Sequence, residues 1–385
     1  MRVLMLNNEF PPLGGGTGTV NRALLQQFAQ TPDLEIDLVT SALGRRSERE
    51  QFAARIRIFK VPVNSQNIHH SSNRELLTYA ARALPAALRL HRTRAYDLCF
   101  AWSAVPAGGV ALALRRMTGL PYLVRVCGPD IPGFERRYGL LYSVLSPSIR
   151  AIWRGAAAVV AKCAGEADMI RAVDRGVKVS LVANGVGIGA FQLATIPDHG
   201  PLRLICVARL IERKGQQHLI EAVRRLLAEG IAITLDLVGT GDAHSALQAQ
   251  AVAAGIAGHV HFIGYVPREA IAARYAGAHV FVLPSYNEGM SVATLEALAA
   301  GLPVVVTRTG GTAELVAEGV NGLTFNWADV ESLVAHLRQL ANDRALARRM
   351  GAASRMRAGL FSWESATQQY LDIFAEITRS EAIPA

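Results

Sequence analysis

The sequence predicts an α/β protein of two domains. Short apolar segments of strand length alternate with longer segments of helical periodicity along almost the whole chain, which is typical of parallel sheets covered by helices. Several of the apolar segments end in glycine-containing turns. A length of 385 residues is enough for two domains that each bury a core of their own.

The first domain opens with a strand, a glycine-rich loop and a helix. Residues 2–6 form a short apolar strand, Gly14, Gly15 and Gly16 lie in the loop that follows, and residues 19–29 carry apolar side chains at helical spacing. The loop lacks the third glycine of the dinucleotide pattern G-x-G-x-x-G, and no acidic residue ends the second strand. These departures argue against a dinucleotide site.

The remaining segments of the first domain continue the alternation. We expect strands at residues 55–61, 97–101, 121–126, 157–161 and 178–182, and helices at residues 73–93, 103–118, 137–154 and 164–173.

The second domain begins with a strand over residues 202–208, followed by a loop that contains Arg209 and Lys214. Lys214 is the only lysine after residue 178, in a chain whose 40 basic residues include 36 arginines. Because a lysine ammonium is a compact point charge, this choice indicates a phosphate contact. A solvated loop charge is the alternative.

A strand, turn, helix and second strand follow one another between residues 280 and 306. The backbone N–H groups of residues 289–293 would start the helix, where the helix dipole favours an anion such as phosphate. Glu288 and Glu296 flank that position, and an ionised carboxylate accepts hydrogen bonds from hydroxyl groups. The pattern therefore predicts a ligand that is part phosphate and part sugar.

Composition limits the class of protein and its location. Hydrophobic residues make up 51% and charged residues 18%, as in a compact globular protein. The four cysteines are widely spaced, which predicts buried free thiols in a reducing cytoplasm. Neither a signal peptide nor an apolar run of spanning length is expected. We therefore predict a cytoplasmic protein, with peripheral attachment to the inner face of the membrane left open.

The positive charge lies in the first half of the chain. Residues 1–200 hold 24 Lys and Arg against 14 Asp and Glu, whereas residues 201–385 hold 16 against 17. This asymmetry indicates that the first domain faces an anionic partner, such as a membrane surface or a lipid pyrophosphate. A general preference for arginine in the source proteome would explain it equally well.

The stretch from Glu288 to Glu296 resembles the E-x7-E signature of the retaining glycosyltransferases of family 4. The run from Gly301 to Val306, followed by Gly310, Gly311 and Glu314, continues that family's pattern. The resemblance covers nearly the whole chain and implies the GT-B fold, in which two Rossmann-like domains face each other across a cleft. It places the domains at residues 1–190 and 200–362, with a hinge at about residues 184–200 and a C-terminal helix at about 364–380 that crosses back to the first domain.

The resemblance also implies a reaction and its residues. A sugar would pass from a nucleotide diphosphate sugar to a hydroxyl of a glycan or lipid-linked acceptor, with retention at the anomeric carbon. Arg209 and Lys214 would hold the diphosphate, Glu288 would accept from the donor sugar, and Glu296 would accept from the ribose. Further donor contacts are implied at Gly15, Gly16, Gly239, Tyr265, Val266, Gly289, Met290, Ser291 and Val292. Neither a cofactor nor a metal is implied, because basic side chains and a helix N-terminus replace the cation.

The chain departs from the family at one point of the first domain. A His-Gly-x-Asp stretch of the family corresponds here to Cys127-Gly-Pro-Asp130. We take Asp130 as a catalytic candidate beside Glu288, Arg209 and Lys214. Asp130 and Arg125 are also candidates for contact with the acceptor or the donor sugar. His69 and His70 are candidate acceptor contacts or simply exposed. We interpret the alternating acidic residues of the second strand, Asp33, Glu35 and Asp37, as a solvated strand face.

Two other functions remain as alternatives. The glycine loop would suit a Rossmann-type oxidoreductase, although its missing third glycine argues against NAD(P) binding. The basic first half would suit a nucleic-acid-binding protein, although aromatic residues for base stacking make up only 6% of the chain. We therefore expect no nucleic-acid partner.

Overall fold

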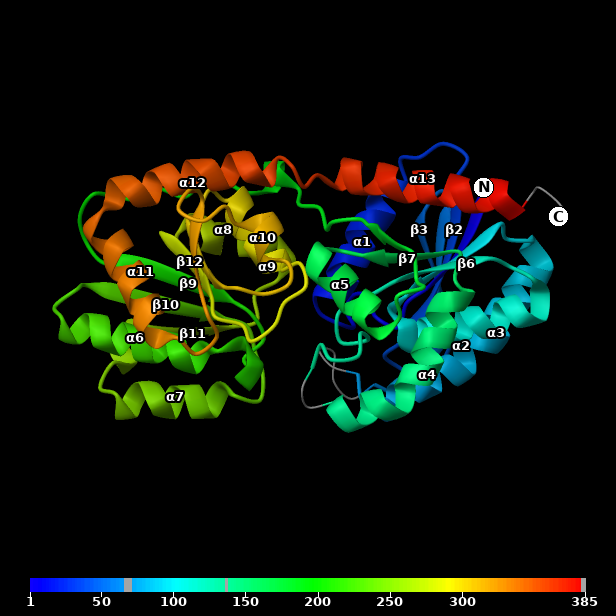
Figure 1. The fold of residues 1–385 in the computed structure, drawn as a ribbon, viewed down its shortest axis with the longest axis horizontal. Helices are drawn as coiled ribbons and strands as arrows, with labels where there is room; N and C mark the ends of the chain where they lie inside the picture. Colours follow the sequence, from blue (N-terminus) through cyan, green and yellow to red (C-terminus); the bar gives the residue numbers. More distant parts are fainter. Residues whose placement is uncertain (66–70, 136–137, 382–385) are drawn as a thin grey trace. The chain divides into compact units, whose positions relative to one another are not determined.

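The structure is a computed structural model that describes residues 1–65, 71–135 and 138–381. It divides the chain into two compact units. The first unit comprises residues 1–184 and 363–385, and the second comprises residues 185–362. Each unit is a largely parallel sheet with helices on both faces, so the predicted α/β fold is confirmed (Figure 1).

The first unit contains an eight-stranded sheet in the order β3-β4-β2-β1-β5-β6-β7-β8. Its strands are β1 (Arg2–Leu6), β2 (Glu35–Ala42), β3 (Glu48–Ala53), β4 (Ile56–Pro62), β5 (Leu98–Trp102), β6 (Tyr122–Arg125), β7 (Ala158–Ala161) and β8 (Val179–Leu181). All neighbours run parallel except β3, which is antiparallel to β4. The sequence did not predict β3, because it is a charged, exposed edge strand without an apolar run.

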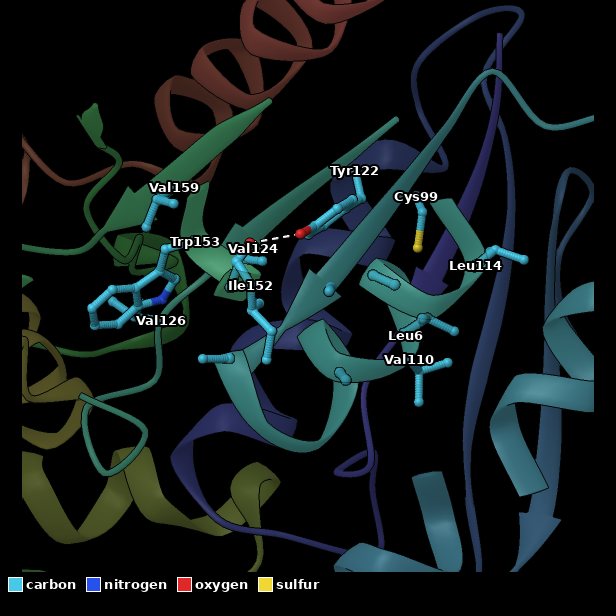
Figure 2. Close-up of a cluster of buried hydrophobic side chains, with 14 of the residues drawn as sticks. Leu6, Cys99, Val110, Leu114, Tyr122, Val124, Val126, Ile152, Trp153 and Val159 are labelled. Atoms are coloured by element: carbon cyan, nitrogen blue, oxygen red, sulfur yellow. Dashed lines mark hydrogen bonds between the residues drawn. The ribbon is translucent and has the colours of Figure 1, made fainter. Parts of the chain in front are cut away.

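Helices cover both faces of this sheet (Figure 1). One face carries α2 (Asn73–Arg94), α3 (Gly109–Thr118), α4 (Gly139–Gly155) and α5 (Ala164–Val173), and the other carries α1 (Gly16–Phe28) and α13 (Trp363–Glu381). Figure 2 shows the core beneath the first set, where Cys99 and Tyr122 from neighbouring strands lie beside Leu114 of α3 and Ile152 of α4. The Tyr122 hydroxyl donates to the Ile152 carbonyl at 2.6 Å, so the buried phenol is satisfied.

The C-terminal helix α13 packs on the first unit through aromatic side chains. Tyr370 and Phe374 contact Phe100 of β5 with ring centroids 5.1 and 5.6 Å apart, and Phe374 also lies 5.8 Å from Phe28 of α1. All four rings are buried. Helix α13 therefore belongs to the core of the first unit.

The second unit contains a six-stranded parallel sheet in the order β11-β10-β9-β12-β13-β14. Its strands are β9 (Leu202–Val207), β10 (Ile233–Val238), β11 (Val260–Gly264), β12 (Val280–Leu283), β13 (Val304–Thr307) and β14 (Gly322–Phe325). Its helices are α6 (Gln216–Ala228), α7 (His244–Ala253), α8 (Arg268–Ala276), α9 (Val292–Ala299), α10 (Thr312–Leu315), α11 (Val330–Asn342) and α12 (Arg344–Ala358). The chain runs outward from β9 to β11 and then returns to the other side of β9 with β12, so the topological switch point lies between β9 and β12.

The segment after the unit boundary is bound to the second unit. The Ala194 N–H donates to the Ala300 carbonyl at 2.8 Å, and the Arg355 guanidinium of α12 donates to the carbonyls of Ile188 and Phe191 at 3.2 and 3.0 Å. Residues 185–196 thus follow α9 and α12 as part of that unit.

Two details of the first unit differ from the predictions. The helix predicted over residues 103–118 is regular only from Gly109, because residues 103–108 form a wider turn with a non-helical kink at Val105. Asp37 is not solvated: it is 3% exposed, accepts from the Arg57 Nε at 2.8 Å and also accepts from the Tyr96 hydroxyl. The reason is the register, which places Arg57 of β4 directly beside Asp37.

The four cysteines are free, as predicted, with Cys99, Cys163 and Cys206 buried and Cys127 partly exposed. Within the described ranges, no helix is both long and apolar enough to cross a membrane.

Candidate functional site

Most of the predicted donor-binding residues gather at one edge of the second sheet. In a parallel sheet the carboxyl ends of the strands meet at a common edge, and ligands bind where the strand order reverses. Arg209 and Lys214 follow β9, and Glu288 to Ser291 follow β12, so these residues flank the switch point from both sides. Gly239 follows β10, and Tyr265 and Val266 follow β11 at the same edge.

The loops after β9 and β12 are joined by an ion pair between Lys214 and Glu288. Both side chains are largely buried, with 13% and 17% of their surfaces exposed. Burial alone would raise the pKa of Glu288, but Lys214, with further contributions from Ser285 and Arg213, outweighs it and lowers the pKa. Glu288 is therefore a carboxylate at neutral pH, held by the cation that was predicted to bind phosphate.

Backbone contacts fix the same two loops. The Tyr286 N–H donates to the Arg213 carbonyl at 2.7 Å, and the Arg213 guanidinium donates to the Asn287 carbonyl at 3.3 Å. Gly215 has a φ of +72°, and a Cβ there would lie 2.0 Å from the Pro284 carbonyl oxygen. Only glycine permits this approach of the two backbones.

Helix α9 begins directly behind Glu288. Ser291 is its N-cap and accepts from the Thr294 N–H at 3.2 Å. The N–H groups of Val292 and Ala293 belong to the first turn, whose donors have no carbonyl partner within the helix. This helix start follows the turn of Glu288, which pairs with Lys214, and its role as a phosphate site remains a prediction.

The loops after β10 and β11 complete this edge. A Cβ on Gly239 would lie 2.1 Å from the Ala208 carbonyl oxygen, and the Gly239 N–H donates to the Gly264 carbonyl at 2.8 Å. Three successive strand-end loops therefore lie side by side next to Arg209. The Tyr265 side chain is 63% exposed there, and Val266 is half-buried.

Glu296 lies one turn further into α9. Its Oε2 accepts from the Tyr275 hydroxyl of α8 at 3.1 Å. Burial raises the pKa of Glu296, although Arg268 and Tyr275 partly oppose this effect. The pKa shifts of the two signature glutamates are thus opposite, because among the described residues a cation pairs directly with Glu288 and none with Glu296.

A small pocket opens between the turn after β12 and the turn after β13. Its polar lining comes from Glu288, Ser291 and the threonines Thr294, Thr307, Thr309 and Thr312. A Cβ on Gly311 would lie 1.8 Å from the Gly289 carbonyl oxygen, so Gly311 sets the distance between the two turns. The glycine pair after β13 therefore supports the turn that carries Glu288.

Gly15 and Gly16 belong to the first unit. Gly15 caps α1, and its N–H donates to the Glu9 Oε2 at 3.4 Å, while Gly16 starts the helix. An ideal Cβ on Gly15 would meet no atom within 4 Å. The contact of this loop with the donor phosphate remains a prediction. In the structure the Gly15 N–H group already has the Glu9 carboxylate as its acceptor.

Asp130 anchors a loop of the first unit. Its two carboxylate oxygens accept from the N–H groups of Ala104 and Cys127 at 2.6 and 2.7 Å. Burial raises the pKa of Asp130 despite these bonds, and burial raises the pKa of the Cys127 thiol to about 12. The geometry gives Asp130 a structural function, and its catalytic role remains a prediction.

Arg125 does not fit the sugar contact predicted for it. It is 2% exposed, its guanidinium stacks 4.4 Å from the Trp102 ring, and it donates to the Tyr370 hydroxyl at 2.9 Å and to the Asn184 side chain. Arg125 instead joins β6 to α13 and to the last residue before the unit boundary. The sequence could not indicate this, because Tyr370 lies 245 positions away.

Two candidates are not described by the structure. His69 and His70 fall outside the described residues. In the described part of the chain, no three His, Cys, Asp or Glu side chains form a group that could hold a metal ion.

Sequence reasoning missed several residues that shape the site. Arg213 and Gly215 adjoin Lys214, so their position next to a predicted site residue was a usable signal. Tyr275 and Trp327 come from other segments and carry no motif. Trp327 contacts both Tyr286 and His218, with ring centroids 5.4 and 5.0 Å apart.

Two family profiles match the chain, one in each unit. Residues 15–185 match the glycosyl transferase 4-like domain, and residues 194–357 match the family of glycosyl transferases group 1.

Similar proteins of known activity support the same grouping. A GDP-mannose-dependent alpha-(1-6)-phosphatidylinositol monomannoside mannosyltransferase of Mycolicibacterium smegmatis is 36% identical over 172 residues, which cover 43% of this chain and 45% of that protein. A D-inositol 3-phosphate glycosyltransferase of Streptomyces avermitilis is 32% identical over 238 residues, which cover 56% and 51%. The chain thus spans about half the length of the curated relatives that it matches.

Solved structures match over the whole chain. A sucrose-phosphate synthase from Thermosynechococcus elongatus has a TM-score of 0.84 at 20% identity and covers 99% of this chain and 100% of its own. HepE of Anabaena, solved in complex with UDP and glucose, has a TM-score of 0.77 at 19% identity, with coverage of 97% and 99%. At these identities the likeness shows the fold, which is that of the GT-B glycosyltransferases.

Proposed function

The chain belongs to the glycosyl transferases of group 1, and on this premise we propose that it transfers a sugar from a nucleoside diphosphate sugar to an acceptor hydroxyl with retention at the anomeric carbon. The observation that carries the proposal is the buried pair of Lys214 and Glu288 at the topological switch point, next to the start of α9. It places a cation, helix N–H groups and a carboxylate beside one another. A diphosphate joined to a sugar needs these three kinds of partner.

Each group of the pair has a part in the reaction. Lys214, Arg209 and the first N–H groups of α9 stabilise the diphosphate as the bond from its oxygen to the anomeric carbon breaks, because negative charge develops there. The acceptor oxygen forms its bond on the same face of the sugar, and its proton passes to the leaving phosphate. Glu288 accepts from a hydroxyl of the donor sugar, and Glu296 accepts from the ribose. Because the cationic groups neutralise the diphosphate, we propose that the reaction needs no metal.

The acceptor is a glycan or a lipid-linked glycan, which would make the enzyme part of polysaccharide or glycolipid synthesis. A relative named for a phosphatidylinositol mannoside supports a lipid acceptor. We extend the proposal to peripheral attachment of the first unit to the cytoplasmic face of a membrane. The excess of basic residues in the first half of the chain and the exposed Leu140 and Val144 of α4 support this attachment.

The proposal is tested by ligand binding and by turnover. The thermal midpoint of the full chain is measured with UDP, GDP, ADP and NAD, each with magnesium or EDTA. A ligand at about 100 times its Kd adds about 2.7 kcal/mol of stability, so a selective ligand raises the midpoint by several degrees. Release of UDP or GDP is then followed with UDP-glucose, UDP-galactose, UDP-N-acetylglucosamine and GDP-mannose.

We expect a shift with one nucleoside diphosphate, unchanged by EDTA, and turnover of a sugar derivative of the same nucleotide. Glu288→Gln should abolish turnover while the protein remains folded at a lower stability, which circular dichroism checks. A shift with NAD alone, or full turnover in Glu288→Gln, would refute the proposed site and favour an oxidoreductase or a different donor site.

A further inference from the structure

Trp327 lies in the loop between β14 and α11, which carries no part of the family signature. The loop is a tight turn: Ala328 has a φ of +62°, and Asp329 caps α11 by accepting from the Ser332 N–H at 3.0 Å. A left-handed residue other than glycine costs free energy and persists where its surroundings fix it. The turn therefore presents Trp327 in a defined position.

The indole of Trp327 contacts both loops of the proposed donor site. On the β9 side it meets His218 edge to face at 5.0 Å, and its Cζ3 lies 2.9 Å from the place a Cβ on Gly215 would occupy. On the β12 side it meets Tyr286 edge to face at 5.4 Å. Gly215 is the residue after Lys214, and Tyr286 lies two residues before Glu288.

From these contacts we propose that Trp327 is a positioning residue that holds the loops of Lys214 and Glu288 at the separation their ion pair requires. The expected effect of Trp327 on turnover rests on the proposed function, whereas its expected effect on the loops rests on the contacts alone. A single rigid ring between two loops fixes their distance at little entropic cost, since a tryptophan has only two side-chain torsions. Loss of such a support displaces catalytic groups without removing them.

The test compares Trp327→Leu and Trp327→Phe with Leu337→Ala in the full chain. Leu337 lies on α11 and is fully buried, so its truncation destabilises the same unit while the indole of Trp327 and its contacts with His218 and Tyr286 stay in place. Amide hydrogen exchange is measured for residues 209–215 and 284–290. We expect Trp327→Leu to speed exchange in both segments and Trp327→Phe to restore their protection. Leu337→Ala should not speed exchange in these two segments more than in the rest of the second unit.

Turnover of the donor accepted by the wild type gives the second readout. We expect Trp327→Leu to lower kcat about ten- to a hundredfold with a smaller change in KM, because the displaced pair acts on the charge of the transition state. Trp327→Phe should recover most of kcat, and Leu337→Ala should keep it near the wild-type value.

The outcomes separate this inference from the proposed function. Absence of turnover in the wild type refutes the proposed function, whereas the exchange experiment still decides the role of Trp327. Unchanged exchange in both loops of Trp327→Leu, or equal losses of kcat in Trp327→Leu and Leu337→Ala, would reduce Trp327 to a residue that only stabilises the fold.

Discussion

At the scale of single residues, the site depends on charges that are buried together. Lys214 and Glu288 lie on loops 74 positions apart, and only 13% and 17% of their side-chain surfaces are exposed. A buried carboxylate without its cation is costly, because burial disfavours the charged form. The pair therefore links the geometry of the site to the stability of the second unit.

Replacement of Lys214 by methionine should destabilise the protein by about 3–5 kcal/mol at pH 7, the usual cost of leaving one charge of a buried pair alone. The double variant Lys214→Met/Glu288→Gln should recover part of that loss.

The folded-state pKa of Glu288 lies below its ordinary value of 4.5, so the pair stabilises the protein above pH 4.5 and its contribution is lost as the pH falls through the lower folded pKa. Urea unfolding at pH 7 and pH 3 measures both effects. A double variant no more stable than Lys214→Met would contradict the coupling.

Glu296 should behave in the opposite way. Because burial raises its folded pKa, the carboxylate opposes folding as the pH rises through that pKa, and stability from this group is complete only below its unfolded pKa. Glu296→Gln should therefore raise the stability at pH 7, and this gain should disappear at acidic pH. The same variant should weaken binding of the nucleoside diphosphate about tenfold, which is equivalent to the loss of one hydrogen bond. Thermal unfolding at two pH values and calorimetric titration test the two statements. Lower stability of the glutamine variant at pH 7 would show that the charge is better solvated than its surroundings indicate.

At the scale of elements, the site is assembled by turns that approach one another closely. The turns after β9, β12 and β13 touch through backbone atoms at Gly215 and Gly311, where a side chain has no room. The resemblance named Gly311 as part of a pattern, and the structure supplies the physical reason for a glycine there. It faces the carbonyl of Gly289, next to Glu288.

Gly311→Ala should disturb the turn of Glu288 through this contact. Its φ of −103° permits alanine, so the effect comes from the overlap of the new Cβ with the Gly289 carbonyl, and a cost of about 1–3 kcal/mol is typical of such overpacking. We expect loss of donor turnover together with a lower urea midpoint. Gly258→Ala, where a Cβ would meet no atom within 4 Å, serves as the matched control. Wild-type turnover in Gly311→Ala would mean that the turn adapts without consequence for the site.

The sequence predicted helix α13 but not the contacts that the helix makes. Its apolar periodicity predicted a helix, and Trp363–Glu381 is a helix. The buried hydrogen bond from Arg125 to Tyr370 was not predictable, and Arg125 was misread as a sugar contact for that reason. A polar residue in a strand looks the same in the sequence whether it faces a ligand or a distant helix.

At the scale of the whole molecule, charge and exposed apolar side chains coincide in the first half of the chain. Leu140 and Val144 of α4 are 85% and 71% exposed, and Arg150 and Arg154 of the same helix are also exposed. A helix with this composition can bind an anionic membrane surface in two ways, by burying its apolar side chains and by the attraction of its basic side chains to the lipids.

We therefore expect the protein to sediment with vesicles of phosphatidylcholine containing phosphatidylglycerol at low salt and to be released at high salt, because screening weakens the attraction of the basic residues. Leu140→Ser/Val144→Ser should lower the bound fraction. Val252→Ser, which changes a 67% exposed valine of α7 in the second unit, should not. Equal binding of the wild type and the two variants, or binding that does not depend on salt concentration, would contradict attachment through α4.

The sequence by itself determined the α/β class and the positions of most strands and helices, because hydrophobic periodicity and strand-to-helix turns are local properties of the chain. It also indicated Lys214, Glu288 and Glu296 as candidate site residues, whose roles remain predictions. The tertiary structure decided the pairing of Lys214 with Glu288, the opposite pKa shifts of the two glutamates, the burial of Asp37 and Arg125, and the contact of Trp327 with both loops. Each of these depends on which strands become neighbours and in what register. Strand order is set by the packing of segments far apart in the chain, and local periodicity does not encode it.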